Sequence, residues 1–194
     1  MSQPERGDYL GRHLYHELQC LLCAATEWRV QQTINPNDSI PGQHIKMYAM
    51  DSAALHARAL FEFLTSNTVP NHVGIDLYGV NRLASDRYRD RDSDPGLGCW
   101  SNPLHAFLMH LRDRTVTQRL KSFDRTEMKD LSRMPVDFAR EVVELWQEFV
   151  RRLRGQDEAL ADAAQFALDE AIAKAARVAT SEANSRHGIS PIAW

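Results

Sequence analysis

Apolar residues return every three or four positions in five stretches of the chain, which is the spacing of amphipathic helices. No stretch keeps the strict alternation of apolar and polar residues that marks a strand, so we expect no sheet. The pattern predicts an all-α helical bundle of about five helices, forming a single domain over residues 1–194. The expected helices cover residues 8–31, 43–66, 101–121, 135–154 and 157–184.

The stretch 43–66 has the least polar pattern of the five. Its apolar residues cover most of the helical circumference, and only the stripe through Asp51, Arg58 and Glu62 is ionic. Such a helix is typical of the centre of a bundle, where neighbours cover it on several sides. We therefore expect residues 43–66 to form the central helix.

The four other helices each have one apolar face, which in 101–121 is formed by Leu104, Phe107, Leu108, Leu111 and Thr115. Residues 1–8 are expected to be loose. Pro135 suits a first helical turn, and Gly155 ends the helix that follows it. The expected inward residues are Leu10, Leu14, Leu18, Leu21, Leu22, Ala25 and Trp28 in 8–31; Val142, Leu145, Trp146, Phe149, Val150 and Leu153 in 135–154; and Ala163, Phe166, Ala167, Ile172 and Ala176 in 157–184.

The stretch 67–100 is a long irregular connection, rich in glycine and proline. A connection of this length in a compact domain is usually functional or contains short elements of its own. Residues 73–83 are expected to form one such element.

The composition is that of an ordinary globular protein and excludes several classes. The 194 residues are 43% hydrophobic and 25% charged, which is enough to bury a core. The formal net charge is −3, so a nucleic-acid surface would have to be a local basic patch. No stretch approaches the roughly 20 apolar residues of a membrane span, and the N-terminus has no secretory pattern. Together with three cysteines, this predicts a reducing, cytoplasmic location.

The first helix carries a cluster of candidate metal ligands. His16, Cys20 and Cys23 lie on one stripe, and a His and a Cys four residues apart can bind the same ion. Zinc needs four ligands around one point, however, and one straight helix offers two or three. Free cysteines are often small core residues. We therefore expect no metal and no other cofactor, and keep zinc as the alternative.

A second set of residues combines histidine and arginine on two helices, 43–66 and 101–121. Histidine can move protons near neutral pH, and the planar guanidinium of arginine can hold a phosphate. These groups suffice for metal-free RNA cleavage, in which a base activates the 2′-hydroxyl and cations stabilise the charged phosphorane. The catalytic candidates are His56, Arg58, His110 and Arg114, and the weaker binding candidates are Asp51, Glu62, His105 and Arg112.

The same residues have a purely structural interpretation. A single histidine in a bundle is commonly a core residue that donates to a neighbouring carbonyl. Arg58 can form an ion-pair network with Asp51 and Glu62 that fixes how helices dock. Both interpretations remain open from the residues alone.

The segment His56-Ala-Arg-Ala-Leu-Phe-Glu-Phe63 resembles a pattern in uncharacterised bacterial helical proteins, which have His-x-Arg-x-Leu in a central helix. In those proteins a later helix has His-Leu followed by Arg, here His110-Leu111 with Arg112 or Arg114, and a Trp-containing helix follows, here with Trp146. The aspartate-rich connection 86–94 is similar too. The resemblance covers about residues 45–150. That group in turn resembles the HEPN superfamily, small α-helical bundles of toxin–antitoxin and phage-defence systems.

The resemblance implies an RNA partner and a homodimer, because many HEPN domains are metal-independent ribonucleases with a composite site across a dimer. Their pattern is Arg, four to six residues, then His at the start of a late helix, whereas this chain has that spacing only from Arg6 to His13. Either His56, Arg58, His110 and Arg114 replace that site, or the protein is a non-catalytic member. The rival function is a helical module that binds a protein partner.

Overall fold

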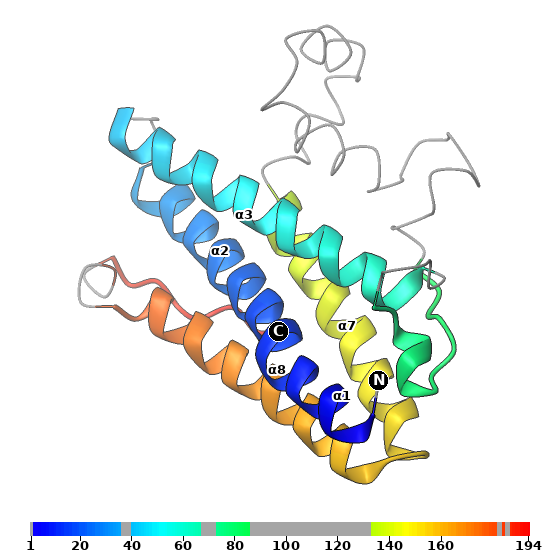
Figure 1. The fold of residues 1–194 in the computed structure, drawn as a ribbon. Coiled ribbons are helices and arrows are strands. Elements are labelled where there is room, and N and C mark those ends of the chain that lie inside the picture. Colours follow the sequence, from blue (N-terminus) through cyan, green and yellow to red (C-terminus); the bar gives the residue numbers. More distant parts are fainter. Residues whose placement is uncertain (1, 36–39, 67–72, 86–132, 182–183, 185–186) are drawn as a thin grey trace, which may run out of the picture.

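The fold is known from a computed structural model, in which four long helices pack into an all-α bundle (Figure 1). No strand occurs in the described part of the chain. The fifth expected helix, 101–121, lies outside that part, so the described residues hold four long helices rather than five. The structure describes residues 2–35, 40–66, 73–85, 133–181, 184 and 187–194.

The N-terminal helix is longer than expected and is uninterrupted from residue 3 to residue 34. It consists of α1 (Gln3–Tyr9), a π-helical segment η1 (Leu10–Leu14) and α2 (Tyr15–Ile34). The expectation that residues 1–8 are loose is therefore wrong. The local reason is the helix start: Pro4 lies in the first turn, and the Glu5 carboxylate accepts a hydrogen bond of 2.6 Å from the backbone N–H of Ser2.

The four long helices form two antiparallel pairs, the first of α2 with the next helix, α3 (Ile40–Thr65), and the second of α7 (Met134–Arg154) with α8 (Glu158–Ala179). Helix α3 runs back along α2, and α7 is followed closely by α8. The Asp157 carboxylate caps α8 by accepting a hydrogen bond of 3.1 Å from the Leu160 N–H. Helix α8 ends five residues before the predicted boundary at residue 184.

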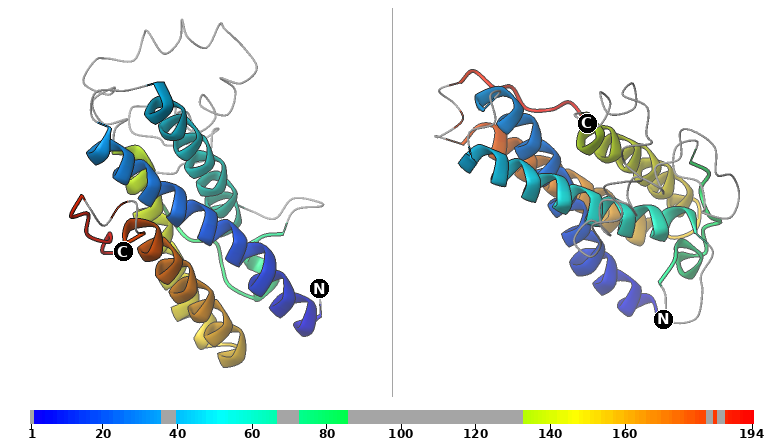
Figure 2. Two further views of the ribbon diagram at one scale, coloured as in Figure 1. Left: turned by 90° about the vertical axis from the view of Figure 1, so that its left-hand side faces the viewer. Right: turned by 90° about the horizontal axis from the view of Figure 1, so that it is seen from above.

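Among the described long helices, α2 and α7 each pack on all three of the others. Helix α3 packs on α2 and α7, and its outer side leaves Tyr48 74% and Leu55 51% exposed. The prediction of α3 as the central helix therefore does not hold for the described part of the bundle. Figure 2 shows the same arrangement from two further directions.

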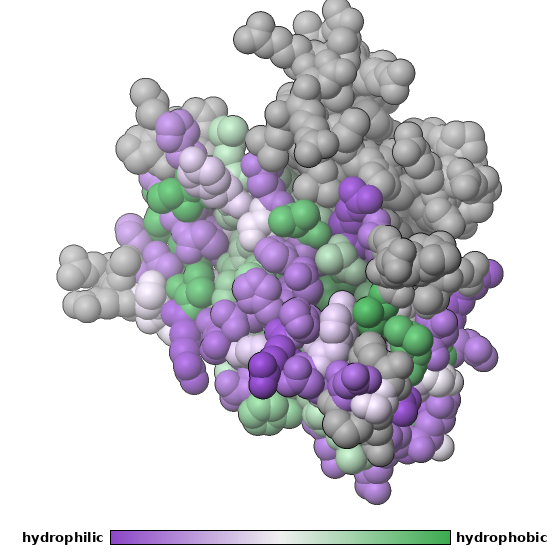
Figure 3. Space-filling view, in the orientation of Figure 1, coloured by the Kyte–Doolittle hydropathy of each residue, from purple (hydrophilic) through white to green (hydrophobic). Residues whose placement is uncertain are grey.

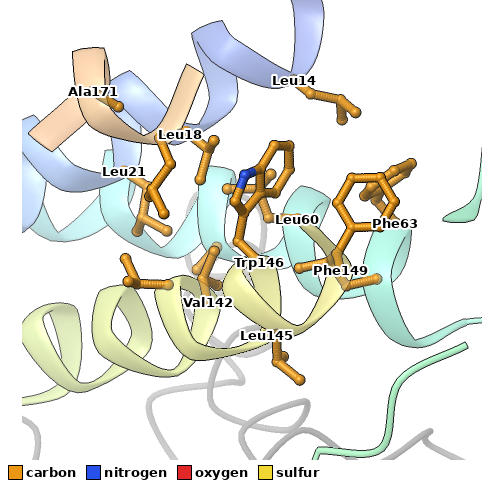
Figure 4. Packing of buried hydrophobic residues seen from close by; sticks show 14 of the residues in the cluster. Leu14, Leu18, Leu21, Leu60, Phe63, Val142, Leu145, Trp146, Phe149 and Ala171 are labelled. Carbon is orange, nitrogen blue, oxygen red and sulfur yellow. The ribbon is translucent and has the colours of Figure 1, made fainter. Parts of the chain in front are cut away.

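The core is centred on Trp146 of α7, which lies between side chains of the other helices (Figure 4). Its indole N–H donates a hydrogen bond of 3.0 Å to the carbonyl of Ala164 in α8. Phe63 and Phe149 meet with ring centroids 5.7 Å apart, edge to face. The inward faces predicted for 8–31 and 135–154 are confirmed, except that Trp28 is only half-buried.

The described part of the long connection contains a short 3₁₀ helix, η2 (Ile75–Tyr78), within the predicted element. Gly79 ends it with a left-handed φ of 76°, which favours glycine. The Tyr78 hydroxyl donates to the carbonyl of Arg6 at 3.0 Å, and the Leu83 N–H donates to the carbonyl of Leu64 at 2.9 Å. The connection is thus fixed to α1 and α3.

Candidate functional site

The side chains of His56 and Glu17 meet where α2 and α3 lie side by side. Nδ1 of His56 lies 2.7 Å from Oε2 of Glu17, and their side chains are 15% and 29% exposed. Because a carboxylate accepts, the hydrogen must be on Nδ1, which leaves Nε2 of a neutral imidazole as the proton acceptor. His56 is therefore oriented by a carboxylate, as general bases in enzymes commonly are.

His16 lies beside this pair on α2. The rings of His16 and His56 are edge to face with centroids 6.0 Å apart. Cys20 follows one turn later, with its Sγ 3.6 Å from Nε2 and 3.8 Å from Nδ1 of His16. Burial raises the pKa of the Cys20 thiol, and the negative charge of Glu17 raises it further, so the thiol stays neutral at pH 7.

Tyr9 and His13 extend the cluster towards the N-terminus. Their rings lie 4.9 Å apart between centroids and are tilted by 31°. Burial raises the pKa of Tyr9, and the charge of Glu17 contributes in the same direction, so Glu17 influences both ends of the cluster. We call the set Tyr9, His13, His16, Glu17, Cys20 and His56 the seam cluster.

Arg58 does not join the seam cluster. Its Nε donates to Oε1 of Glu62 at 2.7 Å, and the two side chains are 34% and 37% exposed. Residues two apart on a helix point to different sides, so Arg58 and His56 face away from one another. Asp51, the other predicted partner of Arg58, is half-buried two turns earlier on α3.

Half of the predicted site falls on residues that the structure does not describe. These are His105, His110, Arg112 and Arg114. Their meeting with His56 therefore stays a prediction.

The zinc alternative gains no geometric support. Within the described ranges, no three side chains of His, Cys, Asp or Glu gather as a metal ion would require. His16 and Cys20 do touch, but Cys23 packs against the hydrophobic core from its place one turn further along α2. A free cysteine in such a place acts as a small apolar residue.

Glu17 is the functional candidate that sequence reasoning missed. It stands between the inward residues Leu14, Leu18 and Leu21, so a carboxylate there borders the core and needs a partner. The position of Glu17 in the sequence therefore indicated that its carboxylate would have a partner. Nothing in the neighbouring sequence identifies that partner as His56, 39 residues away.

Hydrophilic side chains are gathered over the face where α2 and α3 run side by side, with a few hydrophobic ones between them (Figure 3). In the described residues, no helix is both long and apolar enough to cross a membrane.

No protein-family model matches the chain, and neither a curated protein nor a solved structure matches it. The seam cluster is therefore interpreted from its own chemistry.

Proposed function

We propose that this chain is a HEPN-like helical protein that binds RNA and cleaves it without a metal ion. One observation carries the proposal: a carboxylate orients His56 at a partly open helix seam, and a second imidazole lies beside it. Two imidazoles can act as the general base and the general acid of a metal-free transfer at a phosphodiester, and a carboxylate can orient the base. The setting expected from the resemblance, a cytoplasmic toxin–antitoxin or defence system, is part of the proposal.

In this mechanism Nε2 of His56 removes the proton of a ribose 2′-hydroxyl. The 2′-oxygen then attacks the adjacent phosphorus, and the bond to the 5′-oxygen of the next nucleotide breaks. His16, if protonated, gives its proton to that leaving oxygen. The products are a 2′,3′-cyclic phosphate and a free 5′-hydroxyl. Glu17 stabilises the imidazolium that forms on His56, as a carboxylate does in other catalytic triads.

The pentavalent phosphorane also needs positive charge around its oxygens. His110 and Arg114 remain candidates for that role, with His105 and Arg112 as weaker ones, from this chain or from the partner in a homodimer. Arg58 faces another side of α3. Within one chain we assign Arg58, with its partner Glu62 and with Asp51 two turns earlier on α3, to contacts away from the reacting phosphate.

The test is cleavage of a fluorescent single-stranded RNA by the purified chain in the presence of EDTA. We expect a cyclic-phosphate product, and a loss of at least a hundredfold in rate for His56→Ala. His44→Ala is the matched control, because His44 is an exposed histidine of the same helix. His110→Ala tests the sequence-predicted partner. Intact RNA after prolonged incubation, or equal rates for wild type and His56→Ala, would refute the catalytic proposal.

A second function, a non-catalytic module that binds a protein partner, is favoured by the exposed Tyr48 and Leu55 on α3. Their exposed fractions of 74% and 51% are high for large apolar side chains on a helix that faces a core on its other side. The net charge of −3 also weakens non-specific attraction to RNA. This function predicts no RNA binding even at low salt, and association in solution that Leu55→Arg abolishes without unfolding the chain.

A further inference from the structure

The seam cluster begins at a local change in helix geometry. The backbone N–H of Tyr15 donates to the carbonyl of Leu10, five residues earlier, which is the hydrogen bond of a π-helix. Such segments are rare, and they frequently occur at functional sites. Tyr9, His13 and Glu17 follow one another at intervals of four residues, and residues at that spacing are neighbours along a helix.

Tyr9 and His13 differ in how they are held. Tyr9 is half-buried and packs against the hydrophobic core, whereas His13 is exposed. The contact between their rings, 4.9 Å between centroids, places a rigid aromatic group behind the exposed imidazole. The protein thus presents a planar, supported ring to solvent.

This ring pair lies one helical turn from the proposed reacting centre. His13 and Glu17 are four residues apart, which corresponds to about 6 Å along a helix. Glu17 holds His56, and its charge also acts on Tyr9. One nucleotide can bridge such a distance, so a strand whose phosphate lies at His56 can bring a neighbouring base to His13.

We propose that the Tyr9–His13 pair is a stacking subsite for one base of a single-stranded RNA whose backbone passes His56. The ligand is any one of the nucleobases, because every base has a face that can stack on an aromatic ring. This inference rests on the proposed function and adds to it the position and the chemical nature of a neighbouring subsite. An ordinary contact between residues four apart on a helix is the structural alternative.

The test is fluorescence anisotropy with the purified full chain at one fixed salt concentration. The probe is a labelled 2′-O-methyl RNA oligonucleotide, which cannot be cleaved through a 2′-hydroxyl. An abasic oligonucleotide of the same length and charge serves as the second probe. We expect His13→Ala to weaken binding of the RNA roughly tenfold, the usual effect of removing one stacking ring. The same variant should bind the abasic probe like wild type.

Two further variants separate stacking from other roles. His13→Phe keeps a ring and should retain most of the RNA affinity, whereas His13→Gln keeps hydrogen-bonding groups and should not. His187→Ala is the matched control, since His187 is exposed in the C-terminal tail. Because His13 is exposed too, all variants should unfold at nearly the wild-type temperature.

The outcomes distinguish this inference from the proposed function. Equal RNA affinity of wild type and His13→Ala would overturn the stacking subsite and leave the cleavage proposal standing. An equal loss on both probes would show that His13 contributes charge rather than stacking, and would also overturn it. If wild type bound neither probe, the proposed function itself would fall, and the subsite with it.

Discussion

Nδ1 of His56 lies 2.7 Å from Oε2 of Glu17, although the two residues are 39 positions apart in the chain. This hydrogen bond joins α3 to α2 at the edge of the core, where both side chains are partly shielded from water. A carboxylate in this position both orients an imidazole and stabilises its protonated form. The pair can therefore serve the packing of the two helices, the chemistry at their seam, or both.

Replacing Glu17 by glutamine separates these roles. The amide oxygen of Glu17→Gln can still accept from Nδ1 of His56, but it cannot stabilise an imidazolium by charge. We expect kcat for RNA cleavage to fall at least tenfold while KM stays close to wild type. The free energy of unfolding should fall by about 1 kcal/mol, because the pair is partly exposed.

The control for this variant is Glu144→Gln, which removes a carboxylate from an exposed position on α7. It should change neither kcat nor stability. If Glu17→Gln lowered the free energy of unfolding but left kcat unchanged, the pair would have only a packing role.

Arg58→Ala tests whether Arg58 belongs to a structural ion-pair network. The partner of Arg58 in the described residues is Glu62, and both side chains are about one-third exposed. Ion pairs four residues apart on a helix surface contribute about 0.3–0.5 kcal/mol. We expect Arg58→Ala to lower the free energy of unfolding, measured by urea titration, by less than about 1 kcal/mol.

A buried network would behave differently, because removing one partner of a buried ion pair costs about 3–5 kcal/mol. A loss of that size for Arg58→Ala would contradict the exposed pair seen here. Arg154→Ala is the comparison, since Arg154 pairs with Asp162 at 3.0 Å across α7 and α8 and is also exposed. The two variants should have similarly small effects.

The buried face of a helix was predictable where large apolar residues lie on one side of the helix and charged residues on the other. In α7 all six predicted inward residues are buried, because charged side chains occupy the opposite face. In α8 the prediction failed in part: Phe166 is 67% exposed, and Ala163, Ile172 and Ala176 are only half-buried. The face that packs contains Leu160, Ala161, Ala164, Ala167, Leu168, Ala171 and Ala175. Alanine occurs on several sides of α8 and gives little contrast between them.

The site was predictable in the same uneven way. His56 stood out as a histidine among apolar residues, and the structure places it at a helix seam with a carboxylate. Its partner Glu17 could not be found from spacing, because the contact depends on how α2 and α3 align. Arg58 was grouped with His56 through a sequence motif, but two residues along a helix turn a side chain to another face.

Trp146→Phe tests the centre of the core. Trp146 is fully buried, and its N–H donates to the carbonyl of Ala164, so the substitution removes a hydrogen bond and leaves unfilled space. We expect the free energy of unfolding to fall by about 2 kcal/mol, from the cavity and the lost hydrogen bond together. Urea titration measures this loss directly. Phe166→Leu, on the exposed side of α8, should change it by less than about 0.5 kcal/mol.

The stability of the bundle should decrease at alkaline pH, because burial raises the pKa of the Cys20 and Cys23 thiols above their ordinary value of 9.0. Between the ordinary and the raised pKa, the unfolded chain has lost these protons and the folded chain retains them. Stability therefore falls as pH rises. The contribution is fully present below about pH 9 and is lost above it. The raised pKa of Tyr78 acts in the same direction at higher pH.

Urea midpoints measured under reducing conditions between pH 7 and pH 10.5 test this expectation. Wild type should keep a constant midpoint up to about pH 8.5 and then lose stability steadily. The double variant Cys20→Ala, Cys23→Ala should lose less over the same range, because Cys20 and Cys23 contribute the earlier part of the decrease. Identical slopes for the two proteins would show that neither thiol is shielded from solvent, which would contradict the packing of Cys23 against the core.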